Sequence, residues 1–223
     1  VWAYPSLVAL MDDAMRRYSD RTAYSFMGKG FSFAQIDQAS QAFAAYLQGL
    51  GLSPGDRVAV MMPNVPQYPM TVAAILRAGY AVVNVNPLYT ARELSHQLRD
   101  AGAKAIVIIE NFAATLQACI AETEVEHVVL ASMGDTLGTL KGMLVNYVVR
   151  NAKKLVPAFE LPRAVRFNEA LSRGARQAFT PAQVGPDDVA VLQYTGGTTG
   201  VSKGAVLLHR HIVANLLQSE AWN

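Results

Sequence analysis

The stretch of this chain best suited to chemistry is a short run rich in glycine and threonine, LQYTGGTTGVSKG, at residues 192–204. Its glycines can adopt backbone conformations closed to other residues, so main-chain amides can approach a ligand closely. Its hydroxyl groups add donors, and its one lysine adds a positive charge. Together they indicate a loop that binds the phosphates of a nucleotide. The residues assigned to this loop are Tyr194, Thr195, Gly196, Gly197, Thr198, Thr199, Gly200, Ser202, Lys203 and Gly204.

The order of these residues excludes a Walker A loop. In that motif serine or threonine follows the lysine, and the loop opens directly into a helix. Here Ser202 precedes Lys203, and residues 189–194 and 204–208 read as strands, before a helix at about 209–219. A plain surface turn is the less favoured alternative, because turns between apolar strands are seldom this long. For the tyrosine at the strand end, packing against the sheet is as reasonable as contact with a nucleotide.

The chain before this loop alternates between strands and helices. Apolar patterns predict strands at 57–62, 81–85, 105–109 and 127–131, with helices at about 66–78, 91–101 and 112–122. Thr90 and Glu93 form a capping box for the second of these helices, and Gly102 suits its end. Strands separated by helices pair in parallel through right-handed crossovers. We therefore expect an α/β fold with a mostly parallel sheet flanked by helices.

Two elements precede this alternation. Apolar residues from Leu7 to Tyr18 recur at helical spacing. Residues 22–27 and 31–33 resemble a hairpin that turns at residues 28–30.

The composition is that of a globular chain. Hydrophobic residues make up 52% and charged residues 16% of it, which is enough for a substantial core. The chain shows no signal-peptide pattern and no uninterrupted apolar run of about 18 residues, so we expect neither secretion nor a spanning helix. The single cysteine, Cys119, lies in an apolar helical pattern, which favours a structural role and a reducing compartment. A cytoplasmic protein is expected, either free or peripherally attached to the inner face of the cytoplasmic membrane.

Other polar residues lack the spacing that catalysis or metal binding requires. His209 and His211 point about 200° apart on a helix and have no further ligand beside them, which disfavours a metal site. The adjacent carboxylates at 12–13 and 187–188 do not converge on one atom. We interpret them as solvated positions.

A basic, amphipathic segment lies at residues 138–157, GTLKGMLVNYVVRNAKKLVP. Residues 141–166 hold six lysines and arginines against one glutamate, whereas the whole chain has a net charge of +2. This local charge favours an anionic membrane surface as partner, and nucleic acid is not expected because interleaved aromatic and basic residues are lacking. Packing of the segment against the rest of the protein is an equally favoured alternative. The apolar stripe comprises Leu140, Met143, Leu144, Tyr147, Val148 and Leu155, and its basic flanks are Lys141, Arg150, Lys153 and Lys154.

The loop resembles the signature Tyr-Thr-Ser-Gly-Thr-Thr-Gly-x-Pro-Lys-Gly of the superfamily of AMP-forming acyl- and aryl-CoA synthetases, adenylation domains and luciferases. Gly196 replaces its serine and Ser202 its proline, so one hydroxyl and one φ restraint are lost. Residues 31–36, 52–59 and 76–90 are similar to earlier segments of the family, in the same order. The Thr-Gly-Gly-Thr-Thr-Gly-Val form resembles the bacterial long-chain fatty acid–CoA ligases in particular.

The resemblance implies a ligase that activates a fatty acid with ATP through an acyl-adenylate and then forms a thioester with coenzyme A. It implies that Thr195 helps to ligate Mg²⁺, that residues 196–200 surround the β- and γ-phosphates, and that Lys203 adds charge. It also implies an N-terminal fragment, with a sheet subdomain at 1–185 and the loop and following helix at 186–223 beginning the next subdomain. Because the C-terminal domain would then be missing, the fragment is expected to be inactive alone.

Two alternatives remain open. The first is an adenylating enzyme for aryl acids or amino acids, because the loop indicates phosphate binding but does not identify the carboxylic acid. A nucleotide-binding or membrane-docking module without catalysis is the other.

Overall fold

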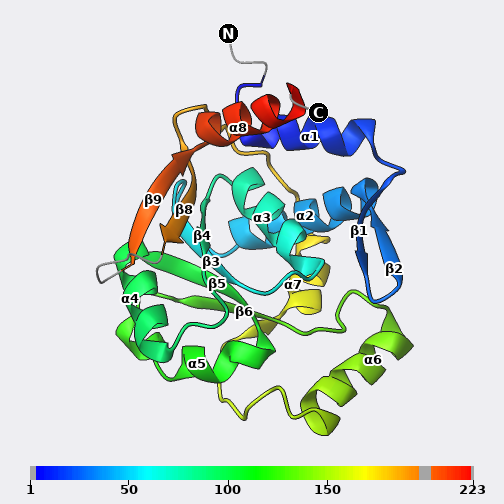
Figure 1. Ribbon diagram of the computed structural model, residues 1–223, viewed down its shortest axis with the longest axis vertical. Helices are drawn as coiled ribbons and strands as arrows, with labels where there is room; N and C mark the ends of the chain where they lie inside the picture. Colours follow the sequence, from blue (N-terminus) through cyan, green and yellow to red (C-terminus); the bar gives the residue numbers. More distant parts are fainter. Residues whose placement is uncertain (1–3, 196–201, 222–223) are drawn as a thin grey trace.

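The computed structural model describes residues 4–195 and 202–221, and in this part of the chain a seven-stranded sheet forms the centre (Figure 1). Along the sheet the order is β7 (Val165–Arg166), β6 (His127–Ala131), β5 (Ala103–Ile109), β3 (Arg57–Met61), β4 (Ala81–Asn84), β8 (Val189–Thr195) and β9 (Lys203–Leu208). Neighbouring strands pair in parallel, except that β9 runs antiparallel to β8. The expected α/β fold with a mostly parallel sheet is therefore confirmed.

Helices cover both faces of the sheet. Alternate residues of β3 contribute to opposite cores, with Val58 and Val60 in one and Ala59 and Met61 in the other. The first core includes residues of α1 (Leu7–Arg17), α2 (Phe33–Gln48), α3 (Gln67–Arg77) and α7 (Phe167–Gly174), and the second includes residues of α4 (Ala91–Ala101) and α5 (Ala113–Gln117). The last helix, α8 (His209–Ala221), packs beside α1 (Figure 1). With both faces covered, the parallel strands are nearly continuous apolar runs.

Helix α4 has the bounds that its local signals predict. The Thr90 hydroxyl accepts a hydrogen bond from the Glu93 amide, and the Glu93 carboxylate accepts one from the Thr90 amide. At the other end Gly102 has φ 57°, a left-handed conformation that favours glycine. A Cβ there would also lie 2.5 Å from an Arg57 guanidinium nitrogen. Both ends of α4 are thus fixed by local chemistry.

The prediction of one continuous helix over residues 112–122 is wrong, because the structure has a short helix there with a 3₁₀ turn on each side. Two 3₁₀ turns, at Glu110–Phe112 and Ile120–Glu122, flank the short α5. The chain leaves the helical region at Cys119, where φ is −134°. Leu116 and Cys119 are nevertheless both buried at a helical spacing, so the apolar pattern does not reveal the break.

The predicted hairpin exists but turns earlier than expected. Its strands are β1 (Thr22–Phe26) and β2 (Lys29–Ser32). Met27 and Gly28 form the turn, with φ of 48° and 75°. A two-residue turn with positive φ at both positions matches the twist of an antiparallel pair, whereas the sequence suggested a turn over residues 28–30.

Asp12 is exposed, as the sequence suggested, but it also forms an ion pair that the sequence did not indicate. It lies 2.5 Å from a guanidinium nitrogen of Arg77, whose side chain is 4% exposed. Asp37 lies at 2.5 Å from the same nitrogen. Because a buried guanidinium requires such partners, this ion cluster joins α1, α2 and α3.

The remaining adjacent carboxylates do not converge. Asp13 accepts hydrogen bonds from Tyr4 at 2.7 Å and from Arg16 at 2.5 Å. Asp187 pairs with Arg210, and Asp188 accepts a hydrogen bond from the Gly185 amide at 2.7 Å.

Strands β8 and β9 follow the subdomain boundary predicted at residue 185, and they join the same sheet as β3 to β7. The division of the chain into 1–185 and 186–223 stays a prediction. Within the described residues, no helix is both long and apolar enough to cross a membrane.

Candidate functional site

Both ends of the predicted phosphate loop lie at one edge of the sheet. Because β8 runs parallel to β4, its last residue, Thr195, lies at the carboxyl edge, where open α/β sheets bind their ligands. β9 returns antiparallel, which places Lys203 opposite Thr195 and Gly204 opposite Tyr194. Thr195 and Lys203 are both exposed. The predicted loop residues Gly196, Gly197, Thr198, Thr199 and Gly200 lie outside the described residues.

Tyr194, at one end of the predicted loop, packs its side chain between the β8–β9 hairpin and α4. Its side chain is 8% exposed, and its hydroxyl donates a hydrogen bond of 2.6 Å to Oδ2 of Asp100 on α4. Burial, together with this hydrogen bond to a carboxylate, raises the pKa of Tyr194 far above its usual value. The neutral phenol is therefore the form that donates. Of the two interpretations of this tyrosine, the structure favours packing beneath the hairpin.

The Tyr194 ring explains the glycine at position 204. A Cβ on Gly204 would lie 2.9 Å from Cζ of Tyr194 and 3.0 Å from Cε2. Such distances are too short for carbon atoms in contact. Gly204 therefore lets the backbone of β9 lie directly against the ring, a packing role that the sequence alone did not distinguish from phosphate binding.

The second end of the loop contacts α4 as well. Nε2 of His96 lies 3.4 Å from the carbonyl oxygen of Ser202. The Ser202 hydroxyl is buried and has no hydrogen-bond partner among the described residues. No carboxylate in the described part of the chain forms a salt bridge with Lys203.

A polar network at the same edge of the sheet was missed at the sequence level. The Asn84 side chain accepts a hydrogen bond of 2.7 Å from the Tyr68 hydroxyl and donates one of 3.0 Å to Gln193. Gln97 of α4 donates to the Asn84 carbonyl at 2.6 Å. The network joins α3, α4, β4 and β8 near the loop end of the hairpin. Its one sequence signal is a polar residue, Asn84, at the end of an apolar strand.

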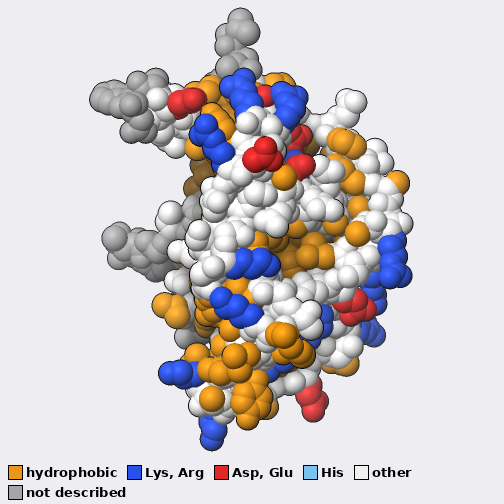
Figure 2. Space-filling view, turned by 90° about the vertical axis from the view of Figure 1, so that its right-hand side faces the viewer, with side chains coloured by type: hydrophobic (Ala, Val, Ile, Leu, Met, Phe, Trp, Pro, Cys, Tyr) orange, Lys and Arg blue, Asp and Glu red, His pale blue; other side chains and the backbone are white. Residues whose placement is uncertain are grey.

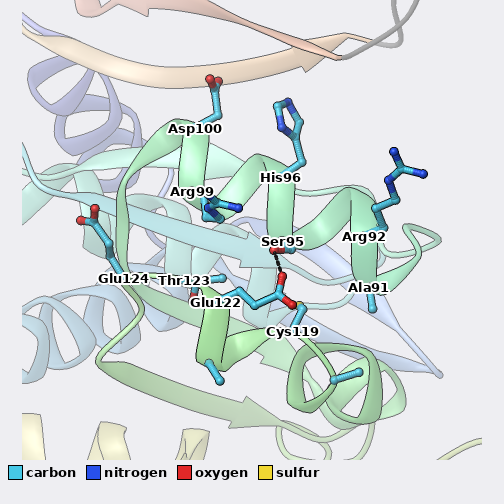
Figure 3. A pocket seen from close by; sticks show the side chains of 12 residues that line it. Ala91, Arg92, Ser95, His96, Arg99, Asp100, Cys119, Glu122, Thr123 and Glu124 are labelled. Carbon is cyan, nitrogen blue, oxygen red and sulfur yellow. Dashed lines mark hydrogen bonds between the residues drawn. The ribbon is translucent and has the colours of Figure 1, made fainter.

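A polar hollow of about 960 Å³ lies beside α4. Figure 3 shows His96 and Asp100 pointing from α4 toward the β8–β9 hairpin, whereas Glu122 and Cys119 lie on the other side of the helix. Burial raises the pKa of the Cys119 thiol to about 11, so the thiol stays protonated at neutral pH and is a poor nucleophile. The expected structural role for this cysteine agrees with its 3% exposure.

Groups that could hold a metal ion are sparse in the part of the chain that the structure describes. No cluster of three or more histidine, cysteine, aspartate or glutamate side chains is present there. His209 accepts a hydrogen bond from the Leu7 amide and His211 accepts one from the Leu208 amide, both at 3.2 Å. The predicted magnesium ligand, Thr195, can offer one hydroxyl.

The basic segment at 138–157 forms two elements rather than one continuous stripe. Helix α6 (Thr139–Tyr147) is followed by a π-helical turn at Val148–Ala152. Four large apolar side chains of α6 are exposed: Leu140 at 81%, Met143 at 58%, Leu144 at 62% and Tyr147 at 62%. Figure 2 shows hydrophobic side chains gathered at the lower end of the face of the molecule that it displays.

The predicted role of Arg150 as a free basic flank is wrong. Its guanidinium donates two hydrogen bonds to Glu110, which also accepts one from Arg166, so Arg150 is held in an internal ion cluster. Lys141 donates to the Met27 carbonyl and keeps its charge. Lys153 and Lys154 are exposed. The segment thus offers three of the four cations that the sequence suggested.

Comparisons with known proteins agree on one group of enzymes. The profile of the family described as AMP-binding enzyme matches residues 11–223. The chain is 55% identical over 219 residues to a long-chain-fatty-acid–CoA ligase of Escherichia coli O157:H7, an alignment that covers 98% of this chain and 39% of that protein. A ligase of the same name from Bacillus subtilis (strain 168) is 36% identical over 219 residues, with 97% and 39% covered.

Solved structures give the same result. The crystal structure of a long-chain-fatty-acid-CoA ligase from Archaeoglobus fulgidus superposes with a TM-score of 0.75 at 26% identity, covering 98% of this chain and 40% of that one. The present chain thus spans about 39% of the length of the ligases that it matches.

Proposed function

Because the chain belongs to the AMP-binding enzyme family, we propose that it is part of a ligase that joins a long-chain fatty acid to coenzyme A. The identity of 55% to a ligase of that name supports this substrate class over aryl acids and amino acids. The observation that carries the phosphate-binding part is the pair of exposed residues Thr195 and Lys203, which face each other across the hairpin at the carboxyl edge of the sheet.

The proposed first half-reaction joins two anions. A carboxylate oxygen of the fatty acid attacks the α-phosphorus of ATP, the bond from that phosphorus to the bridging oxygen breaks, and pyrophosphate leaves. In the second half-reaction the thiol of coenzyme A attacks the acyl carbonyl, its proton is lost to solvent, and AMP leaves. Like charges repel in the first step, so catalysis requires the phosphates to be neutralised and held in place. Lys203, unpaired in the described residues, is suited to the β- and γ-phosphates.

The residues at the hairpin are compatible with Mg²⁺ as part of this proposal. When bound to ATP, Mg²⁺ neutralises phosphate charge and orients the oxygens. It usually keeps several waters and takes only one or two protein ligands beside the phosphates. The single hydroxyl of Thr195 at the end of β8 therefore fits one position.

ATP–pyrophosphate exchange by the full-length protein tests this function. Isotope exchange that depends on palmitate, and not on benzoate or an amino acid, is the expected result. Exchange with benzoate or an amino acid alone would favour the alternative adenylating enzymes. No exchange with any acid would favour a noncatalytic module.

The exposed face of α6 supports a second proposal, contact with an anionic membrane. Leu140, Met143 and Leu144 are each more than half exposed on one short helix, which is unusual for large apolar side chains that gather in a patch. Lys153 and Lys154 follow the π-helical turn after this helix and are exposed too. An apolar face with cationic neighbours matches the interface of an anionic lipid bilayer. Such a surface would hold the enzyme near its fatty acid substrate.

A further inference from the structure

Asp100 and Tyr194 are 94 positions apart in the chain and are joined by a hydrogen bond of 2.6 Å. The Tyr194 side chain is 8% exposed, so loss of this bond would leave a buried hydroxyl without its partner. Building on the ligase function proposed above, we propose that α4 fixes both ends of the phosphate loop, with Asp100 and His96 as positioning residues for ATP binding.

The first end is fixed through the tyrosine ring. Asp100 holds the Tyr194 hydroxyl, and the ring packs directly under Gly204 on the neighbouring strand. Thr195 follows Tyr194, and Lys203 precedes Gly204. One hydrogen bond from α4 therefore orients the backbone on both sides of the loop, next to the two residues best placed to meet phosphate.

The second end is fixed through a backbone carbonyl. Nε2 of His96 approaches the Ser202 carbonyl oxygen at 3.4 Å. His96 and Asp100 are four residues apart, which places them on the same face of a helix, and Figure 3 shows both pointing toward the hairpin. A single helical face thus contacts the chain immediately before and after the loop.

Helix α4 is a rigid platform for this task. Leu94 and Leu98 are fully buried beneath it. Gln97 ties it to the carbonyl of Asn84 at 2.6 Å, at the end of β4. Functional groups are held most precisely when they are built on a packed element of this kind.

The sign of the charge on Asp100 supports positioning over direct contact. A carboxylate repels phosphate oxygens. Asp100 would therefore weaken nucleotide binding if it faced the ligand, whereas its hydrogen bond to Tyr194 directs Oδ2 at the phenol. Its presence beside the loop is explained by what it does to Tyr194.

Substitutions at this pair in the full-length protein test the proposal. Asp100→Ala is expected to raise the KM for ATP in pyrophosphate exchange about tenfold, as expected for a lost buried hydrogen bond. The KM for palmitate should stay unchanged. Asp100→Asn keeps an acceptor for the phenol and should recover most of the loss. Tyr194→Phe should match Asp100→Ala, and the double variant should be no worse than either, because both remove the same interaction.

Tyr4→Phe is the matched control. It removes a tyrosine–aspartate hydrogen bond of similar length, 2.7 Å to Asp13 of α1, and should leave the KM for ATP unchanged. A KM for ATP within twofold of wild type in both Asp100→Ala and Tyr194→Phe would overturn the positioning role. If Asp100→Ala does not fold, the KM values for ATP of Asp100→Asn and Tyr194→Phe test the positioning role instead.

Amide hydrogen exchange separates this proposal from the enzymatic one. Without any substrate, Asp100→Ala should speed exchange in residues 189–195 and 203–208 and leave β3 unchanged. Unchanged exchange at the hairpin would contradict positioning by α4. Failure of the wild-type protein to exchange pyrophosphate, with the hairpin amides still responding to Asp100→Ala, would instead refute the ligase function.

Discussion

Arg150 binds Glu110 through two hydrogen bonds, each 2.9 Å long, and so ties the turn after α6 to the carboxyl end of β5. The Glu110 side chain is 1% exposed, and Arg166 donates to it as well, at 2.8 Å. A buried carboxylate is tolerated only when it is paired in this way. Arg150 lies within the π-helical turn at Val148–Ala152, so the ion pair joins that turn to the end of β5.

Glu110→Gln is therefore expected to destabilise the full-length protein by about 1–3 kcal/mol. The variant leaves two guanidinium groups without their carboxylate, but both are partly exposed, so solvent limits the loss. Chemical denaturation measures the change. Glu169→Gln is the control, because its ion pair with Arg173 is half exposed on both sides and should contribute less than about 1 kcal/mol. Equal losses in the two variants would contradict the importance of burial at Glu110.

Membrane contact by α6 predicts that lipid binding depends on both charge and apolar surface. Replacing Lys153 and Lys154 by Gln should weaken binding to vesicles with anionic lipid by about 30-fold, at about 1 kcal/mol for each lysine near the surface. Leu140→Ser with Leu144→Ser should weaken binding further, since each side chain is more than half exposed.

Vesicle sedimentation at about 0.1 M salt measures both effects. The control for the lysine variant is Arg16→Gln with Arg17→Gln, which removes the same charge from α1, where both side chains are mostly exposed. If the two charge variants lose the same affinity, attraction is general rather than local. If the serine variant binds as wild type does, the face of α6 contacts another part of the full-length protein instead.

The fold was predictable wherever the signals were local. Helix α4 has the predicted bounds because Thr90, Glu93 and Gly102, which lie at its own ends, encode where it starts and stops. The parallel sheet follows from strands that are apolar on both faces. The turn at Met27 was not predictable in detail, because positive φ at a methionine contradicts the usual preference for glycine or asparagine.

Phosphate binding by the loop stays a prediction from its composition, and the side chains that support the loop ends were not predictable. The glycines, threonines and lysine of the loop pointed to phosphate, and the structure places Thr195 and Lys203 together at the carboxyl edge of the sheet. Asp100 and Glu110 gave no sequence signal, because their partners are distant in the chain. The pairing of Arg150 was not predictable for the same reason. Helical periodicity describes the faces of one helix and contains no information about a carboxylate in the turn that follows a distant strand.

Asp135 predicts an unusual dependence of stability on pH. Burial raises the pKa of its carboxyl from 3.8 to about 6, although the Ser132 amide donates to it at 2.7 Å. Between about pH 4 and pH 6 the folded protein therefore binds a proton that the unfolded chain releases. The contribution of this residue to stability falls as pH rises through that window and is constant above it.

Asp135→Asn should remove this dependence. The variant is expected to match wild type near pH 4 and to be more stable by about 3 kcal/mol at pH 7, since its amide oxygen can still accept from Ser132. Denaturation of both proteins at several pH values measures the difference. Asp13→Asn should change with the opposite sign, because hydrogen bonds from Tyr4 and Arg16 lower the pKa of that carboxyl. A difference for Asp135→Asn that does not vary with pH would contradict this assignment.

Lys203 gives the most direct prediction about catalysis. In the full-length protein, Lys203→Ala should lower the rate of pyrophosphate exchange by about 10²–10³, the usual loss when one preorganised charge-stabilising group is removed. Its exposed position at the first residue of β9 means that the fold and its melting temperature should not change. Lys104→Ala is the control, because it removes a lysine whose partner is Glu124 at 2.7 Å, and it should exchange at the wild-type rate. Exchange by Lys203→Ala within threefold of wild type would show that this ammonium does not neutralise the phosphates.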